Sequence, residues 1–479
     1  MEHTDIAILG AGPTGIGAAL RLLELGETNF VVLDASPAAG GLASSCIDEQ
    51  GFTWDLGGHV QFSHYRKFDD YMDLAFRPET QRVPGAPASE GWLWHERESW
   101  IWLKDRFIPY PFQNNLHRLD PQDRWRALQG LLAAAASRTT PENFEQWILA
   151  AFGQGIADLF LLPYNRKVWA HPLDSMDFRW VGERVAVPSL EQAMKSICLQ
   201  EDQVSWGPNR RFRFPLRGGT GAIWRSLAAR IPAKNLRLGA RASRVDAESR
   251  SLRIGTETLR YEALINTAPL TWLTQAMGDA ELSSQTSQLK SSTVHVIGIG
   301  MDGQPPESIQ KMCWMYFPGA ETSFYRVTVF SNYSPNNVPL PGSTWSLMAE
   351  VPESAYLPQA RETLVERVVQ QMCAIKLIPD PNAILSRWNK VLTPGYPTPS
   401  LGRNSILDAV LPRLESQRIF SRGRFGAWKY EVSNQDHSFM QGVEAVDHIL
   451  YGRAEPTLTQ PDLVNQRYNP FPYVEWEAA

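Results

Sequence analysis

The chain has 479 residues, of which 43% are hydrophobic and 20% are charged, and its formal net charge is −5. This composition is typical of a globular protein with about two to four domains, and it excludes a disordered or fibrous chain. The net negative charge argues against bulk attraction to nucleic acid or to an anionic membrane surface.

The cysteines lie far apart and show no CxxC spacing, which argues against a zinc site and against a disulfide framework. We therefore expect no metal ligands and a reducing compartment. The N-terminus lacks a basic segment followed by a long apolar one. The most apolar window, near Leu128, is too short to cross a bilayer, so a cytoplasmic protein is expected. The four cysteines are Cys46, Cys198, Cys313 and Cys373.

The first 35 residues predict a strand over 6–9, a glycine-rich turn, a helix and a second strand over 31–33. Glycines in such a turn allow the backbone to approach a pyrophosphate, which then lies at the positive end of the helix. An acid at the end of the second strand is placed to accept a ribose hydroxyl, and it argues against NADP in this site. The alternative is a purely structural turn. The predicted dinucleotide-binding residues here are Gly10, Gly12, Gly15 and Asp34.

Paired glycines recur in "GGLASSC" and "GFTWDLGGHVQFSHY", and they indicate that the backbone again closely approaches another group. The stretch over 93–111 is aromatic and strand-like. The stretch "RRFRFPLR" over 210–217 is interpreted as an alternating strand with a solvated basic face. Between these two stretches, the hydrophobic period predicts helices over Asp123–Ser137, Asn143–Phe152, Ile156–Leu162 and Ser189–Leu199.

After Phe214, glycines lead into a helix, and strands with short turns follow. The segment over 293–351 is strand-rich, and a helix is expected over Ala360–Ala374. We predict a mixed α/β fold with a Rossmann-type dinucleotide-binding domain assembled from residues 1–92, 209–270 and 415–465. A helical domain over 110–205 and an antiparallel-sheet substrate domain over 271–414 interrupt it.

Several motifs together are similar to those of the amine-oxidase-like FAD flavoproteins. They are GxGxxG followed by Asp34, the pair Gly40-Gly41, "GFTWDLGGH", "FPLRGGTGAIW" and "LINTAPL". Nine ordered blocks, among them "PYPFQNN", "GIADLFLLPYNRKVWA" and "SRGRFGAWKYEVSNQDHSFMQGVEAVD", more sharply resemble the UDP-galactopyranose mutase family of the eukaryotic (fungal and protozoan) type. The chain departs from that pattern in a Pro/Ala/Gly-rich insertion over 82–91 and in His171, near the expected base pocket.

The resemblance implies an isomerase that interconverts UDP-galactopyranose and UDP-galactofuranose without net redox change. Its cofactor is FAD, which is reduced for activity, and NAD(P)H is a candidate external reductant. In that family, reduced flavin N(5) attacks the anomeric carbon and expels UDP, and the ring contracts through an iminium adduct. The implied partner is a UDP-sugar, with no nucleic acid and no membrane; a homo-oligomer stays open.

The resemblance also implies site residues. Arg184 and Arg326 hold the departing diphosphate as catalytic residues, and His59 responds to the flavin at its N(5) face. The polar segment over 434–438 faces cofactor and substrate at a helix N-terminus. The implied substrate-binding residues are Phe62, Tyr110, Gln113, Asn165, Trp169, Asn209, Trp314, Tyr316, Tyr333, Tyr396, Arg424, Tyr430 and Asn434. The implied cofactor-binding residues are Gly10, Gly12, Gly15, Asp34, Gly41, Leu42, Gly58, Val245, Arg424, Gln435 and Ser438.

Three alternatives remain at this point. The same chemistry can act on a different nucleotide-hexose. An amine oxidase or desaturase-like oxidoreductase shares the FAD segments but has no need of two diphosphate-binding arginines. A non-catalytic nucleotide-sugar-binding protein needs no flavin motifs. Flavin absorbance and oxygen consumption distinguish these classes.

Overall fold

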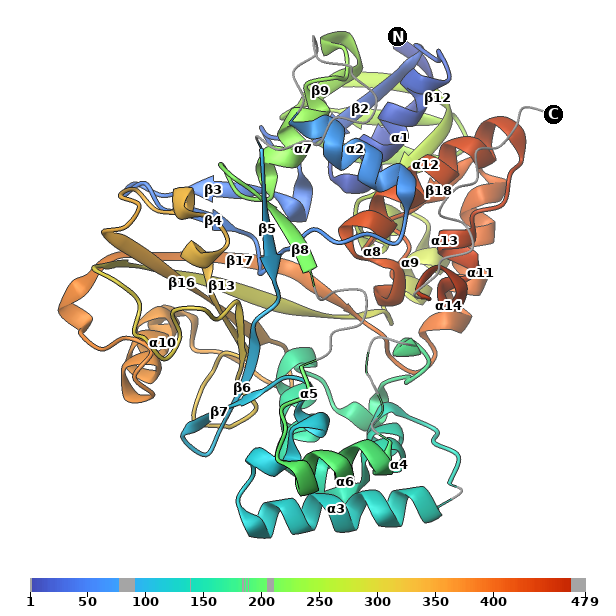
Figure 1. Cartoon of the computed structure of the whole chain (residues 1–479). Helices are drawn as coiled ribbons and strands as arrows, with labels where there is room; N and C mark the ends of the chain where they lie inside the picture. The colour runs from blue at the N-terminus through green and yellow to red at the C-terminus, as the bar shows by residue number, and fades with distance from the viewer. Residues whose placement is uncertain are drawn as a thin grey trace.

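The computed structural model describes residues 2–466, except 77–90, 138, 183–184, 186, 188 and 205–210. In this part of the chain, two large sheets and a layer of helices make up the molecule (Figure 1). The first sheet contains the N-terminal strand β1, the second sheet lies beside it, and the helices α3–α6 lie at the end away from β1.

The first sheet has the strand order β10-β11-β12-β1-β2-β9, and β18 pairs with β12. β1 is parallel to both β12 and β2, as the predicted strand–helix–strand unit requires. The predicted strands over 6–9 and 31–33 are therefore confirmed, and both are longer than predicted. The bounds are β1 Glu2–Leu9, β2 Phe30–Asp34, β9 Leu236–Leu238, β10 Ala242–Asp246, β11 Ser251–Ile254, β12 Glu257–Asn266 and β18 Ile419–Ser421.

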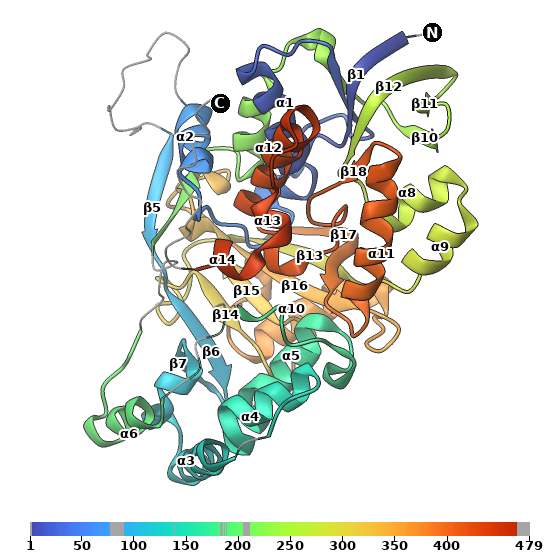
Figure 2. The same cartoon turned by 90° about the vertical axis from the view of Figure 1, so that its right-hand side faces the viewer.

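Helices cover both faces of the first sheet, because its parallel strands are apolar on both sides. In β1, Ile6 and Ile8 pack into one core, and Ala7 and Leu9 pack into the other. The first core is covered by α1 Pro13–Glu24, α2 Arg66–Ala75, α7 Gly221–Ala228 and α12 Gln435–Tyr451. The second is covered by α8 Leu270–Met277, α9 Ala280–Thr286 and α11 Arg403–Ser416. Figure 2 shows α1 and α12 side by side.

The second sheet has the order β17-β13-β16-β15-β14-β6-β7 and is antiparallel except between β14 and β6. Helix α10, Leu364–Ala374, covers one face. Strands β6 and β7, the last two at one side of this sheet, come from outside the segment 271–414 predicted for this domain. The domain boundaries themselves stay a prediction. The bounds are β6 Ser99–Leu103, β7 Arg106–Pro109, β13 Lys290–Asp302, β14 Trp314–Tyr316, β15 Arg326–Val329, β16 Thr344–Glu353 and β17 Ile384–Thr398.

Short elements join these layers. Two small antiparallel pairs are β3 with β4 and β5 with β8. Near the C-terminus, α13 and α14 follow α12. Their bounds are β3 Ser45–Ile47, β4 Thr53–Asp55, β5 Trp92–Glu96, β8 Arg211–Pro215, α13 Pro456–Thr459 and α14 Pro461–Val464.

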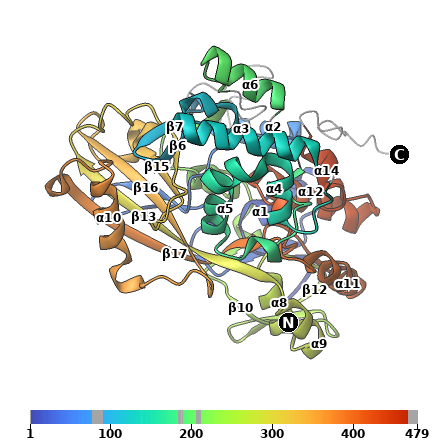
Figure 3. The same ribbon diagram turned by 90° about the horizontal axis from the view of Figure 1, so that it is seen from below.

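The helical layer contains α3 Pro121–Ala136, α4 Phe144–Ile156, α5 Leu162–Trp169 and α6 Leu190–Leu199 (Figure 3). Side chains of Asp120, Asn143 and Ser189 cap α3, α4 and α6 at their N-termini. Three of the four predicted helices are confirmed within a few residues.

The predicted helix over Ile156–Leu162 was wrong in its bounds. Gly153, with φ of 71°, kinks α4, and a π-helical turn over Ala157–Leu161 leads directly into α5. The whole run Phe144–Trp169 is 26 residues long and apolar enough to resemble a membrane span, and 50% of its most apolar window is buried in the protein. The helix to be compared with a membrane span is therefore Phe144–Trp169, and the window near Leu128 is not.

Strand β8 confirms the predicted strand in "RRFRFPLR", but its basic face is not solvated throughout. Arg211 is exposed, whereas Arg213 is buried and forms ion pairs with Asp69 and Asp73 of α2. Because a buried guanidinium needs partners, acids from α2 determine this orientation, and strand alternation alone does not predict it.

A buried acid on α12 makes the stability of the fold depend on pH. Glu444 accepts hydrogen bonds from the backbone nitrogen and the hydroxyl of Thr457. Burial raises the pKa of Glu444 from 4.5 to about 8. The neutral carboxyl therefore favours the folded state at acid pH, and this contribution is lost as the pH rises through the folded-state pKa.

We expect Glu444→Gln, which is neutral at every pH, to lose less stability than the wild type between about pH 5 and about pH 8. Thermal unfolding of the two holoproteins across this range measures the difference. Glu366→Gln, at an exposed position on α10, is the control and should follow the wild type. Parallel pH profiles for wild type and Glu444→Gln would contradict the assignment.

Candidate functional site

A backbone cradle lies at the N-terminus of α1. Gly12 is the N-cap of this helix and provides no side-chain cap, so the first amides of the helix stay available for an anion. A Cβ on Gly41 would lie 3.2 Å from the Gly12 Cα, and a Cβ on Gly15 would lie 1.8 Å from the Gly10 carbonyl oxygen. Only glycines allow these segments to approach each other, as a dinucleotide pyrophosphate requires.

Asp34 ends β2 beside this cradle, as predicted. Its carboxylate accepts from the backbone nitrogen of Ala11 at 2.6 Å and from that of Ser36 at 2.7 Å. A carboxylate has about four acceptor positions, so a ribose hydroxyl can still donate to it. Leu42, next to Gly41, is half-buried. The side chain of Val245, in β10, packs in the core of the first sheet.

The segment Gly57–Phe62, between β4 and α2, forms a tight loop that we call the histidine loop. The backbone nitrogen of His59 donates to the carbonyl oxygen of Gly57 at 2.8 Å. The Nδ1 atom of His59 is buried and has no hydrogen-bond partner among the described residues. Burial lowers the pKa of His59 to about 4, so its imidazole is neutral at neutral pH. A neutral imidazole has one donor and one acceptor nitrogen, which suits a cofactor atom that changes its own protonation.

Arg326, at the start of β15, is paired with a buried acid. Its Nε and Nη2 donate to Glu350 Oε1 at 2.9 and 2.6 Å, and Nη2 also lies 2.8 Å from Oε2. Glu350 is 2% exposed, and the Arg326 side chain is 19% exposed. This ion pair uses the Nε and Nη2 atoms of Arg326, so Nη1 of the guanidinium can still donate to a ligand.

Glu350 also contacts the histidine loop. The backbone nitrogen of Gly58 donates to its Oε1 at 3.0 Å, and the hydroxyl of Tyr325 donates to its Oε2. Burial acts to raise the pKa of Glu350, but Arg326 and these hydrogen bonds outweigh it and hold the pKa below its usual value. One ionised carboxylate therefore connects the histidine loop to Arg326.

Four of the predicted substrate residues form an aromatic and cationic cluster. The ring of Trp169 lies 4.8 Å from that of Tyr430 and 6.1 Å from that of Tyr396. The Arg424 guanidinium lies 4.8 Å from the Tyr396 ring centre. Its Nη1 donates to the hydroxyl of Ser433 at 2.8 Å, which fixes its direction. Such rings with a cation suit a phosphate-bearing ligand.

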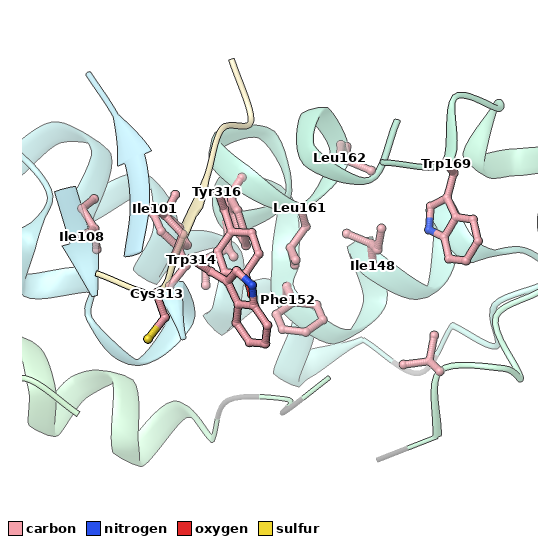
Figure 4. Packing of buried hydrophobic residues seen from close by; sticks show 14 of the residues in the cluster. Ile101, Ile108, Ile148, Phe152, Leu161, Leu162, Trp169, Cys313, Trp314 and Tyr316 are labelled. Atoms are coloured by element: carbon pink, nitrogen blue, oxygen red, sulfur yellow. The ribbon is translucent and has the colours of Figure 1, made fainter. Parts of the chain in front are cut away.

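A second aromatic group lies on β14 and next to it. The ring centres of Tyr110 and Tyr316 are 5.5 Å apart, and the guanidinium of Arg326 lies 5.6 Å from the Trp314 ring centre. Figure 4 shows Trp314 and Tyr316 beside the helical segment that carries Leu161. Trp314 and Tyr316 are buried and Tyr110 is half-buried. Flat rings of this kind provide stacking surfaces for a base.

Other predicted residues are placed less informatively. Tyr333 is fully buried among aromatic rings, and its hydroxyl has no partner in the described part of the chain. Gln113 is 2% exposed, and the Asn165 amide donates to the Leu161 carbonyl oxygen of its own helix at 2.8 Å. Phe62 is half-buried against the His64 ring. Arg184 and Asn209 lie outside the described residues, so their predicted roles stay predictions.

The N-terminus of α12 differs in part from the expectation. Asn434 is the N-cap but its side chain makes no cap hydrogen bond, and Gln435 accepts from Trp224 Nε1 at 2.7 Å. Ser438 lies 3.4 Å from the Ser433 carbonyl oxygen, near the limit of hydrogen bonding. The side chains of Gln435 and Ser438, which were expected to face the cofactor, therefore contact other protein atoms.

Asp436 is directed to the residues after the histidine loop. It is 1% exposed and accepts from the backbone nitrogen of His64 at 3.0 Å, and its carboxylate lies 2.7 Å from His64 Nδ1. Burial would raise the pKa of Asp436, but His437 and His64 outweigh it and hold the pKa well below its usual value. The two histidines and the acid have metal-ligand atoms within 4.8 Å of one another. Asp436 also accepts a hydrogen bond from the backbone nitrogen of His437 at 2.8 Å. The sequence analysis did not identify this group.

Sequence reasoning also missed Glu350. The available signal was a single acid in the otherwise apolar strand "WSLMAEV". A lone acid on a buried strand needs a cationic partner, and Arg326 was already a candidate for that partner.

The residues present fit a flavin dinucleotide on two observations. The glycine cradle leaves helix amides open where a side chain would close them. The His59 Nδ1 atom is buried without a described partner, as expected where a cofactor completes a hydrogen bond.

Comparison with known proteins gives the same assignment. Residues 13–450 match the family model described as flavin containing amine oxidoreductase. The crystal structure of a reduced UDP-galactopyranose mutase is 45% identical, with a TM-score of 0.91 over 96% of this chain and 97% of that one.

More distant structures share the fold alone. A putative protoporphyrinogen oxidase from Exiguobacterium sp. is 16% identical, with a TM-score of 0.69 over 94% of this chain and 99% of that one. A putrescine oxidase is 13% identical, with a TM-score of 0.60 over 94% of this chain and 99% of that one. The chain therefore belongs to the flavin-containing amine oxidoreductase family and, within it, to the family that includes UDP-galactopyranose mutase.

Proposed function

We propose that the chain is an FAD-dependent mutase of the eukaryotic type that interconverts UDP-galactopyranose and UDP-galactofuranose without net redox change. The observation that carries the proposal is Arg326, held by Glu350 beside the histidine loop and the aromatic rings of β14. A site that only oxidises an amine needs the FAD cradle but does not need this cation. The 45% identity to a mutase supports the same substrate class.

In this proposal, the chain's own residues bind and orient the cofactor. The amides at the start of α1 and the backbone of Gly41 hold the pyrophosphate, and Asp34 accepts a ribose hydroxyl. When reduced FAD is bound, it supplies the nucleophile for the anomeric carbon. His59 donates or accepts a hydrogen bond at the flavin face as a neutral imidazole.

The leaving diphosphate is stabilised by a cation that is already in place. Glu350 fixes the guanidinium of Arg326 before any ligand arrives, so little reorganisation is needed during the reaction. Arg184 is the proposed second cation, and Tyr396, Tyr430 and Arg424 are proposed to contact the phosphates or the sugar. The residues proposed to line the uridine pocket are Tyr110, Gln113, Asn165, Trp169, Trp314 and Tyr316.

The histidine loop is proposed to transmit the state of the cofactor to the substrate site. Gly58 bonds to the same carboxylate that holds Arg326, so a change in the loop backbone also changes the environment of the guanidinium. Binding of UDP and the redox state of the flavin are then thermodynamically linked. NAD(P)H is the proposed external reductant, and the cytoplasm is the proposed location.

We expect the purified protein to be yellow, with FAD that is released on denaturation. We also expect it to convert UDP-galactofuranose to UDP-galactopyranose only after anaerobic reduction with dithionite. Chromatography resolves the products of turnover, and an oxygen electrode in parallel measures whether oxygen is consumed. Consumption of oxygen with turnover of an amine would favour the oxidase alternative. A colourless protein that takes up no FAD would exclude the flavoenzyme classes and leave the binding-protein alternative.

We expect Arg326→Ala to lower kcat by about 10²–10³, because the leaving group loses a preorganised cation. Arg326→Lys should recover only part of the activity, because one ammonium does not replace the fork. Steady-state kinetics on the reduced enzyme gives both values, and FAD content per chain shows whether the protein has folded.

The control for loss of an ion pair is Arg361→Ala, because Arg361 pairs with Glu353 at the surface of the same region. A solvent-exposed pair of this kind contributes little to stability, so this variant should keep its activity. Wild-type kcat in Arg326→Ala would show that Arg326 does not contact the reacting diphosphate.

A further inference from the structure

A lysine on α5 extends into the turn between β14 and β15. The Nζ of Lys167 lies 2.9 Å from the carbonyl oxygen of Phe317, 3.1 Å from Thr322 Oγ1 and 3.3 Å from the carbonyl oxygen of Phe324. It also donates to the carbonyl oxygen of Gly319. These acceptors span the whole turn, which we call the 317–324 turn.

The two elements that Lys167 joins carry different parts of the proposed uridine site. On one side of the 317–324 turn, β14 carries Trp314 and Tyr316. On the other side, α5 carries Asn165 and Trp169. The distance between these two groups of side chains therefore depends on how the turn sits against α5.

The chemistry of the contact makes it a strong constraint. The acceptors are uncharged oxygens, and two of the carbonyls belong to buried residues, Phe317 and Phe324. Burial lowers the pKa of Lys167 to about 8, so its ammonium form, with three donors, predominates at neutral pH. Without the ammonium, the Phe317 oxygen loses this donor, whereas the Phe324 oxygen still accepts from the Thr322 hydroxyl at 3.2 Å. Loss of a donor is costly for a buried acceptor.

A separate contact holds the far side of the turn. The backbone nitrogen of Ser323 donates to the side-chain oxygen of Gln371 on α10 at 2.8 Å, and the Gln371 amide donates to the Ser323 hydroxyl at 3.1 Å. The turn is thus fixed to the second sheet through Gln371 and to the helical layer through Lys167. The Lys167 contact sets the position of the turn relative to α5, together with the ring of Tyr164 on α5, which lies 5.5 Å from the ring of Tyr316 on β14.

We propose that Lys167 is a positioning residue that sets the separation of β14 and α5, and thereby the affinity of the site for the uridine part of its ligand. This inference rests on the proposed function, because it names the base-binding half of that site. Arg326 is held independently by Glu350, so the diphosphate contact does not depend on Lys167.

The test compares two inhibitors on the reduced holoenzyme, UDP and inorganic pyrophosphate. For Lys167→Met we expect the inhibition constant of UDP to rise about tenfold or more, because an error well below 1 Å in a supporting contact loosens a site. We expect the inhibition constant of pyrophosphate to stay within about twofold of the wild-type value. We expect kcat to stay within about threefold of its wild-type value, while KM rises. The control is Arg166→Met, which removes a cation from the same helix that pairs at the surface with Glu145.

Equal losses for UDP and pyrophosphate, or an unchanged UDP constant, would overturn the proposal. If Lys167→Met does not fold, Thr322→Val removes one of the acceptors and should weaken UDP alone by about threefold. An unchanged UDP constant in that variant would then overturn it. A wild-type enzyme with bound FAD that binds pyrophosphate but not UDP refutes the proposed function itself, and the inference falls with it.

Discussion

The buried carboxylate of Glu350 is the constraint on which the geometry of this site depends. A charge at 2% exposure is stable only with partners, and its partners come from two distant parts of the chain. Arg326 and Tyr325 lie at the start of β15 in the second sheet, whereas Gly58 belongs to the histidine loop, which follows the separate strand pair β3 and β4. Removing one partner of such a group costs about 3–5 kcal/mol, so the carboxylate holds the loop and the guanidinium in one arrangement.

The histidine loop is fixed near both of its ends. Gly58 bonds to Glu350 at one end, and His64, just beyond the other end, bonds to Asp436 at the N-terminus of α12. His59 lies between these two contacts, one of which is to the second sheet and the other to α12. A loop with fixed ends and a neutral imidazole between them can change its backbone locally without loosening the site around it.

Local sequence patterns predicted the parts of the fold that depend on local interactions. Glycine spacing predicted the turn before α1, and Ser189 marked the start of α6 because a cap bonds within its own helix turn. Contacts far apart in sequence were not predictable in this way. Glu350 and Gly58 are 292 residues apart, and no periodicity relates them. For the same reason, Arg213 was expected in solvent, although acids of α2 pair with it.

In the candidate site too, some residues were predictable from the sequence and others were not. The family resemblance identified Trp169, Tyr396, Tyr430 and Arg424, and the structure brings these four together. Residues that support the site from behind, such as Lys167 and Glu350, were missed. Their importance lies in which oxygen or nitrogen atoms surround them, and a single sequence does not contain that information.

We infer that the histidine loop and Arg326 act as one unit through Glu350. An anaerobic titration with UDP of the oxidised and the reduced holoprotein tests this most directly, carried out on the wild type and on Glu350→Gln. We expect the reduced wild type to bind UDP more tightly than the oxidised form, and we expect this preference to shrink in the variant, because a neutral amide no longer holds both partners. Equal UDP affinities of the two redox forms of the wild type, or an undiminished preference in Glu350→Gln, would contradict it.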